Sequence, residues 1–137
     1  MLLVLDTNVL VSGLLNPAGA PGRVVDLLLA GRLRLAYDDR MLAEYRGVLL
    51  RPRFGFPPQA VEHLIDYITY TGEAVLAPPL DVDALAPTTD LPFAEVALAA
   101  AACCVVTGNK AHFGFLQAPP VLSPTEFLHR WTRSSPG

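Results

Sequence analysis

Short apolar runs alternate along the chain with longer segments in which apolar residues recur every three or four positions. The short runs predict strands buried on both faces, and the longer segments predict helices. The expected strands are Leu2–Leu5, Leu33–Tyr37, Ala74–Leu76, Cys103–Val106 and Val121–Leu122. Buried strands separated by helices predict an α/β fold with a parallel sheet covered by helices.

The helices between these runs carry recognisable start and stop signals. They are expected at Asn8–Leu15, Pro21–Ala30, Arg40–Leu50, Pro58–Tyr70, the alanine-rich segment after Asp90, and Pro124–Trp131. Asp38 or Asp39 is a plausible N-cap of the third helix, and Asp90 of the fifth. The proline-rich segment Ala77–Pro87 is expected to be a loop.

Length and composition restrict the class of protein. With 137 residues, 52% of them hydrophobic and 17% charged, the chain predicts one domain over residues 1–133 and a frayed tail at 134–137. It has no apolar run long enough to cross a bilayer and no signal-peptide pattern, so we expect a cytoplasmic protein without membrane contact. Cys103 and Cys104 are adjacent, lack metal-ligand spacing, and are expected to be buried free thiols.

The net charge of −3 argues against a general nucleic-acid coat protein, which would be basic. It leaves open a nuclease, whose carboxylates bind a metal ion and whose basic residues are local. Arg46, Arg51 and Arg53 form such a basic run.

Three acidic residues can each be interpreted either as ordinary structural residues or as parts of a functional site. Asp6 directly follows the first strand, where it either caps the next helix or holds a cation. Asp90 has the same ambiguity, and Glu44 would ordinarily be a solvated residue on its helix. Because functional crevices lie at the carboxyl ends of parallel strands, Asp6 and Asn109 are expected at the same edge of the sheet.

Five segments, taken in order, resemble the motifs of PIN-domain proteins, and most closely the VapC toxins of bacterial toxin–antitoxin systems. They are Asp6–Asn8, Glu44–Tyr45 before Val48 and Leu49, Asp90–Ala97, Val106–Asn109 and Leu122–Phe127. The resemblance extends from Leu2 to about Leu128. It implies a three-layer α/β/α sandwich with a central parallel sheet of about five strands. It further implies a Mg²⁺- or Mn²⁺-dependent endoribonuclease, an antitoxin partner and a homodimer.

The resemblance also implies roles for particular residues. Asp6, Glu44 and Asp90 match the metal-binding and catalytic acids, Thr7 and Asn8 match residues that support the first acid, and Thr107 matches a hydroxyl that orders the site. The chemistry is reasonable without the family, because two carboxylates about 4 Å apart repel by roughly 4 kcal/mol at an effective dielectric constant of 20. A hard dication removes that repulsion and activates water for attack on phosphorus. Asp6 and Asp90 would be ligands, and Glu44 would orient or deprotonate water.

Asn109 is the main departure from the family pattern, in which an Asp is common at this position. An amide oxygen can still bind a metal ion, but it brings no charge. Glu95 could replace that charge, but it lies some 140° around the helix axis from Asp90. The alternative interpretation of Glu95 is a solvated or supporting acid. Lys110, His112 and Arg46 are candidates for substrate contact, although a surface or packing role is the more usual one for a histidine such as His112.

Two other functions compete with the nuclease. One is a PIN-like module that binds RNA or protein after its catalysis has weakened, which the substitution at Asn109 favours. The other is a haloacid-dehalogenase-type phosphatase, in which an Asp also ends the first strand. That chemistry needs a second Asp two residues later, where this chain has Asn8, so we disfavour it.

Overall fold

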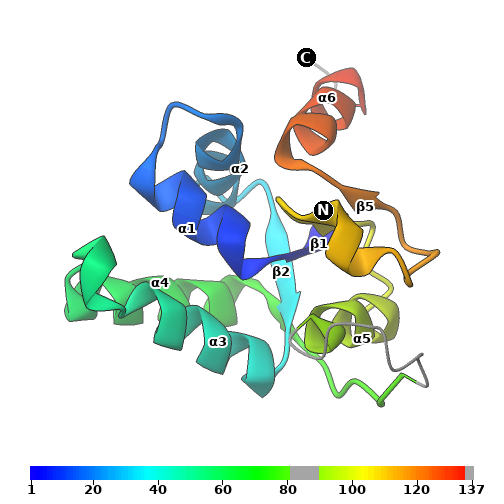
Figure 1. The fold of residues 1–137 in the computed structure, drawn as a ribbon, viewed down its shortest axis with the longest axis horizontal. Helices are drawn as coiled ribbons and strands as arrows, with labels where there is room; N and C mark the ends of the chain where they lie inside the picture. Colours follow the sequence, from blue (N-terminus) through cyan, green and yellow to red (C-terminus); the bar gives the residue numbers. More distant parts are fainter. Residues whose placement is uncertain (81–89, 135–137) are drawn as a thin grey trace.

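A five-stranded sheet forms the centre of the molecule, and every strand pair in it is parallel (Figure 1). The structure is a computed structural model that describes residues 1–80 and 90–134. The strands are β1 (Leu2–Leu5), β2 (Arg34–Tyr37), β3 (Glu73–Ala74), β4 (Val105–Val106) and β5 (Val121–Leu122). They lie in the order β3-β2-β1-β4-β5, which confirms the predicted parallel sheet.

Helices flank this sheet on both sides. They are α1 (Thr7–Leu15), α2 (Ala20–Leu29), α3 (Asp39–Leu49), α4 (Pro58–Thr71), α5 (Leu91–Ala99) and α6 (Pro124–Ser134). In Figure 1, α1 to α4 lie to the left of β2 and α5 lies to its right. Two short 3₁₀ helices that the sequence did not predict, η1 (Pro52–Phe54) and η2 (Lys110–Phe113), lie in the connections after α3 and β4.

The buried face of the sheet explains why the strands formed where apolar runs occur. Leu3, Val4 and Leu5 of β1 are fully buried beneath the helices. Burying one such side chain contributes about 1.5–3 kcal/mol relative to leaving it exposed. A close helix contact adds to this packing, because a Cβ at Gly13 of α1 would lie 2.6 Å from the carbonyl oxygen of Pro21 in α2. Only glycine permits that approach.

The observed boundaries differ from the predicted ones at several element ends. β4 begins two residues later than expected, because the backbone bends at Cys103. That bend leaves Cys103 exposed, so the expectation that both thiols are buried was right only for Cys104. α6 extends to Ser134, three residues past Trp131. The rest of the predicted frayed tail, residues 135–137, and residues 81–87 of the predicted proline-rich loop lie outside the described residues.

Within the described part of the chain, no helix is long and apolar enough to cross a membrane. The candidate functional residues follow the carboxyl ends of β1 and β4, which lie side by side in the sheet. Asp6 follows β1, and its backbone N–H donates to the carbonyl oxygen of Val106, the last residue of β4. This pairing places the segment that starts at Thr107 next to Asp6.

Candidate active site

Asp6 occupies the N-cap position of α1, yet its side chain makes no cap hydrogen bond. Instead it turns toward β4 and accepts a hydrogen bond of 2.6 Å from the Thr107 hydroxyl. Only 6% of Asp6 is exposed. Burial raises the pKa of its carboxyl group, and the neighbouring Asp90 raises this pKa further, against the lowering effect of the Thr107 hydrogen bond. The cap reading of Asp6 is therefore wrong.

Asp90 has the same property at the start of α5. It stands at the N-cap position without a side-chain cap hydrogen bond, and 8% of the residue is exposed. Its Oδ2 atom is buried and has no hydrogen-bond partner. Nδ1 of His112 lies 3.1 Å from Oδ2, close enough for an ion pair when His112 is protonated, but not oriented as a hydrogen bond. Burial raises the pKa of Asp90, and the charge of Glu44 adds to that rise while His112 opposes it.

Glu44 reaches the same region from the middle of α3. Its carboxylate accepts a short hydrogen bond from the hydroxyl of Thr7. The adjacent Tyr45 fixes α3 in place, because its buried hydroxyl donates to the carbonyl oxygen of Leu5 at the end of β1. The Tyr45 ring also packs against Phe93 of α5, with 6.3 Å between the ring centroids. Buried contacts thus hold the two helices that carry Glu44 and Asp90 at fixed positions beside β1.

The remaining predicted residues organise the loop after β4. The side-chain oxygen of Asn8 accepts a hydrogen bond of 3.1 Å from the backbone N–H of Gly108. The fully buried Thr107 hydroxyl accepts from the backbone N–H of Asn109 at 3.0 Å while it donates to Asp6. The side-chain nitrogen of Asn109 lies 2.9 Å from Nε2 of His112. These bonds connect the carboxyl ends of β1 and β4 into one hydrogen-bonded unit.

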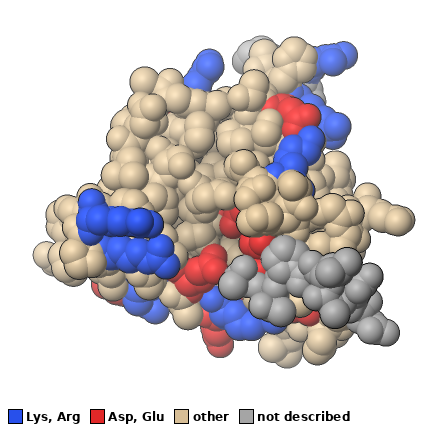
Figure 2. All heavy atoms as spheres, viewed as in Figure 1, with Lys and Arg blue, Asp and Glu red and all other residues tan. Residues whose placement is uncertain are grey.

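One cleft of about 390 Å³ collects these side chains. Its lining includes Asp6, Thr7, Asn8, Glu44, Asp90, Asn109 and His112 from the predicted set, together with Val11, Ser12, Val48, Arg51, Arg53 and Phe54. On the face drawn in Figure 2, Asp and Glu residues gather near the centre, with Lys and Arg residues to their left. Acids and bases that lie far apart in the sequence therefore share a single cleft.

The three acids face the cleft without forming a closed set of ligands. Among residues 1–80 and 90–134, no three His, Cys, Asp or Glu side chains are grouped as a bound metal ion would require. Hydrogen bonds account for part of this spacing, because Asp6 is drawn toward Thr107 and Glu44 toward Thr7. Oδ2 of Asp90 has no hydrogen bond, although Nδ1 of His112 lies 3.1 Å from it.

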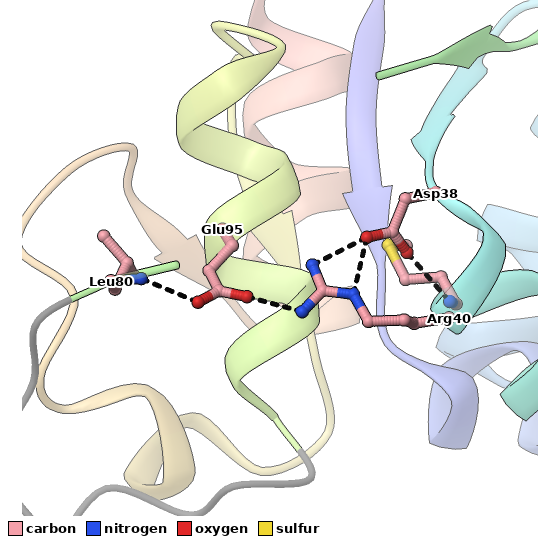
Figure 3. A network of polar contacts seen from close by, with 5 residues as sticks. Asp38, Arg40, Leu80 and Glu95 are labelled. Carbon is pink, nitrogen blue, oxygen red and sulfur yellow. Dashed lines mark hydrogen bonds and ion pairs between the residues drawn. The ribbon is translucent and has the colours of Figure 1, made fainter. Parts of the chain in front are cut away.

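Glu95 lies outside the cleft and takes no part in it. The residue is 4% exposed, and its carboxylate accepts hydrogen bonds of 2.7 Å from Arg40 and from the backbone N–H of Leu80 (Figure 3). Arg40 also pairs with Asp38, the N-cap of α3, and these two acids raise the pKa of the Arg40 guanidinium, Glu95 more strongly. Glu95 is thus a buried bridge between α5 and α3. The alternative reading of Glu95 as a solvated acid is wrong.

Two of the three candidate substrate contacts do not line the cleft. Arg46 pairs with Glu62 at 2.8 Å, and Lys110 pairs with Glu126 at 2.9 Å. His112 does line it. Sequence reasoning noted the basic run but singled out Arg46, whereas Arg51 and Arg53 are the members that reach the cleft. Their position depends on α3 ending at Leu49, a boundary that the sequence defines only to within a few residues.

Comparison with known proteins identifies the family of the chain and structures of similar fold. Residues 2–111 match the PIN domain family, and the chain belongs to that family. The structure of VapBC2 from Rickettsia felis bound to a DNA fragment from their promoter contains a similar chain, with a TM-score of 0.57 and 18% identity, covering 90% of this chain and 98% of that one. A chain in the structure of VapBC-1 from nontypeable Haemophilus influenzae is also similar, with a TM-score of 0.57, 21% identity and coverage of 91% and 99%. A search of curated proteins found no match.

The family match confirms the PIN-domain resemblance, and the two structures confirm the expected fold. At 18% and 21% identity they support the fold alone. The activity must therefore be argued from the cleft of this chain.

Proposed function

We propose that this protein is a divalent-metal-dependent endoribonuclease and the toxin of a type II toxin–antitoxin system. The observation that carries the proposal is the buried Oδ2 of Asp90, which has no hydrogen-bond partner and lies in the same cleft as Asp6 and Glu44. Nδ1 of His112 lies 3.1 Å from that oxygen without forming a hydrogen bond. A buried anionic oxygen without a hydrogen bond is costly, so a site that contains one is suited to a positively charged ligand. Membership of the PIN-domain family supports the same chemistry.

The donor set fits a hard cation. Carboxylate and amide oxygens suit Mg²⁺ and Mn²⁺, whereas soft metals prefer thiolates, and the cleft lining includes no cysteine. Asp6 and Asp90 would hold the ion, with Glu44 and the side-chain oxygen of Asn109 as further donors. When bound, the ion would supply positive charge that stabilises the negative charge developing on the transferred phosphoryl group.

The side chains of the protein supply the orientation and the proton acceptor. In hydrolysis, a water oxygen forms a bond to phosphorus, the bond from phosphorus to the leaving ribose oxygen breaks, and a proton moves from the water to a base. Glu44 is suited to be that base, because the Thr7 hydroxyl holds one of its oxygens in the cleft. Thr107 fixes Asp6 through its donated hydrogen bond, which limits the rotation of that carboxylate. When protonated, His112 can donate a proton to the leaving oxygen at the exposed side of the cleft.

Cleavage of a mixed RNA pool tests the proposal. The purified protein is incubated with Mn²⁺, with Mg²⁺ or with chelator, beside the Asp6→Asn variant, which keeps the size of the side chain and removes its charge. We expect cleavage by the native protein only with metal, and loss of that cleavage in the variant. Equal activity in both proteins would contradict the proposal and indicate a contaminating nuclease.

A second candidate is a binding module of the same fold whose catalysis has weakened. Its support is the neutral side chain of Asn109, which adds no fourth negative charge to the three acids of the cleft. The side-chain nitrogen of Asn109 lies beside His112. Calorimetric titration with Mn²⁺ separates the candidates. Absence of ion binding, together with retained RNA binding, would favour the module.

The proposed toxin role includes a protein partner and action in the cytoplasm. Both similar structures are named as VapBC assemblies, which supports an antitoxin partner for this chain. Co-expression with a small reading frame adjacent to its gene tests this, because an antitoxin should co-purify and suppress cleavage. Size-exclusion chromatography with light scattering tests the proposed homodimer, for which a mass near 14.7 kDa would be the contradicting result.

A further inference from the structure

One wall of the cleft is basic although the protein is acidic overall. Arg51 and Arg53 flank Pro52 at the start of η1, and both line the cleft with Asp6 and Asp90. The segment is well ordered by its backbone. Pro52 restricts its own φ, the N–H of Phe54 donates to the carbonyl oxygen of Arg51, and Gly55 closes the turn at a φ of 69°. The two guanidinium groups are therefore carried on a rigid turn rather than on a long loop.

These two arginines keep their charge available. Within the described residues, Arg40, Arg46 and Lys110 form ion pairs with carboxylates, whereas Arg51 and Arg53 form none. The guanidinium of Arg53 lies 4.8 Å from the centre of the Phe54 ring, a cation–π contact that orders it without neutralising it. Both residues are exposed.

An RNA strand that approaches Asp6, Glu44 and Asp90 meets repulsion from three carboxylates and from a net charge of −3. Unpaired guanidinium groups at the same cleft offset that repulsion, because each can bind a phosphate through two parallel hydrogen bonds. The cleft volume of about 390 Å³ suits one small ligand, and Asp6 in its lining is only 6% exposed. Such a buried group is easier to reach for a single strand, whose nucleotides can be splayed out, than for a rigid duplex.

We propose that Arg51 and Arg53 bind the phosphate backbone of single-stranded RNA next to the phosphate that is cleaved. This inference rests on the proposed ribonuclease function and names the residues that hold its substrate. Arg53 is positioned by Phe54, and Pro52 sets the spacing between the two arginines. In this arrangement the acids at one wall of the cleft carry out cleavage, and the arginines at the other wall bind the strand.

Binding without cleavage tests the inference. Fluorescence anisotropy follows the titration of a labelled single-stranded RNA with protein in chelator, at several KCl concentrations. The test protein is the Arg51→Ala/Arg53→Ala variant. The control is Arg23→Ala/Arg34→Ala, which removes the same charge from two residues that do not line the cleft. Circular dichroism melts establish that both variants fold.

We expect the test variant to bind RNA on the order of tenfold more weakly, and the control to stay within about twofold of the native protein. Each phosphate contact on a single strand contributes about 0.7 to the slope of log K against log salt, so the test variant should have a slope shallower by about 1.4. An unchanged slope in the test variant, or an equal loss in the control pair, would overturn the inference.

Two further ligands distinguish the substrate class. Double-stranded RNA should bind more weakly than single-stranded RNA and depend less on the two arginines, and equal dependence would overturn the single-strand assignment. Single-stranded DNA of the same sequence should share the dependence, because the contacts are to phosphates, although the 2′-hydroxyl can change its affinity. These measurements need no catalysis. Arginine-dependent binding by a protein that never cleaves RNA would refute the ribonuclease alone, and cleavage without that dependence would refute this inference alone.

Discussion

Two buried carboxylates, Glu95 within α5 and Asp90 at its start, differ in how their charge is compensated. Glu95 is 4% exposed and has both oxygens bonded, to Arg40 and to the N–H of Leu80. Asp90 is 8% exposed, begins the same helix, and leaves Oδ2 without a hydrogen bond. Burial alone therefore does not mark a functional acid. What distinguishes Asp90 is the missing hydrogen bond at Oδ2, where a His112 nitrogen lies at 3.1 Å. A buried carboxylate oxygen without a hydrogen bond is a place where a cation would gain binding energy.

The contrast predicts opposite effects of removing charge from the two groups, and activity should show the largest one. Asp6→Asn removes a carboxylate that faces the cleft, so RNA cleavage with Mn²⁺ should fall by roughly 100-fold or more, a loss comparable to that of one preorganised electrostatic contact in an active site. Its thermal midpoint without metal should not fall, because a repulsive charge beside Asp90 has gone. A melt in chelator checks this. Equal loss of activity and stability would mean that Asp6 is structural.

Metal addition should stabilise the protein through the cleft and not through Glu95. At a Mn²⁺ concentration 100 times its dissociation constant, binding to the folded state adds about 2.7 kcal/mol. Differential scanning fluorimetry should therefore show a rise of several degrees in the native protein and in Glu95→Gln, with little or no rise in Asp90→Asn. A rise of the same size in Asp90→Asn would place the metal elsewhere.

Glu95→Gln should instead affect stability. The change keeps the size of the side chain but breaks the charged pair with Arg40, whose side chain is 47% exposed and can be solvated. We expect a decrease of about 1–2 kcal/mol in the free energy of unfolding, after allowance for that solvation. Urea denaturation in chelator measures it, with Asp90→Asn as the matched control on the same helix. A loss in Asp90→Asn as large as that in Glu95→Gln would remove the distinction between the two groups.

The pH dependence of stability should show the smallest effect. Its direction should differ between carboxylates whose pKa is raised by folding and those whose pKa is lowered. The pKa values of Asp6 and Asp90 are raised in the folded protein, so the folded state binds more protons than the unfolded state just above the ordinary value of 3.8. Stability from these groups therefore falls as the pH rises through that window. Glu126 behaves in the opposite way, because the N–H of Ser123 and the ammonium of Lys110 lower its pKa to about 2. Its contribution is present above pH 4.5 and is lost as the pH falls toward 2.

Urea denaturation at a series of pH values in chelator separates these contributions. The native protein minus Asp6→Asn/Asp90→Asn should give a stability difference that becomes more negative as the pH rises from about 4. The native protein minus Glu126→Gln should give a difference that becomes smaller as the pH falls. If the two stability differences changed with pH in the same direction, the proposed environments of these carboxylates would be contradicted.

Much of the sheet could be predicted from the sequence because its strands are buried on both faces and read as uninterrupted apolar runs. The position of Asp6 followed from β1 in the same way. Whether Asp6 and Asp90 cap their helices or face the cleft could not be predicted, because both outcomes use an acid at the same N-cap position. Only the tertiary contacts decide it, since the partner of Asp6 is Thr107, 101 residues later in the chain.

The other limits have the same origin. Helix geometry correctly predicted that Glu95 lies on a different side of the helix from Asp90. No local sequence feature identified its partner Arg40, 55 residues earlier. The choice of Arg51 and Arg53 over Arg46 depended on the turn at η1, which no apolar periodicity marks. The resemblance to the PIN domain supplied the identity of the acids, whereas the geometry of the cleft supplied the basic wall.

Anomalous diffraction from crystals soaked in Mn²⁺ tests the central claim most directly. We predict one strong peak in the cleft, at about 2.0–2.3 Å from carboxylate oxygens of both Asp6 and Asp90, and its loss in crystals of Asp90→Asn. A native crystal with no peak in this cleft, or with its peak bound by other residues, would contradict the account.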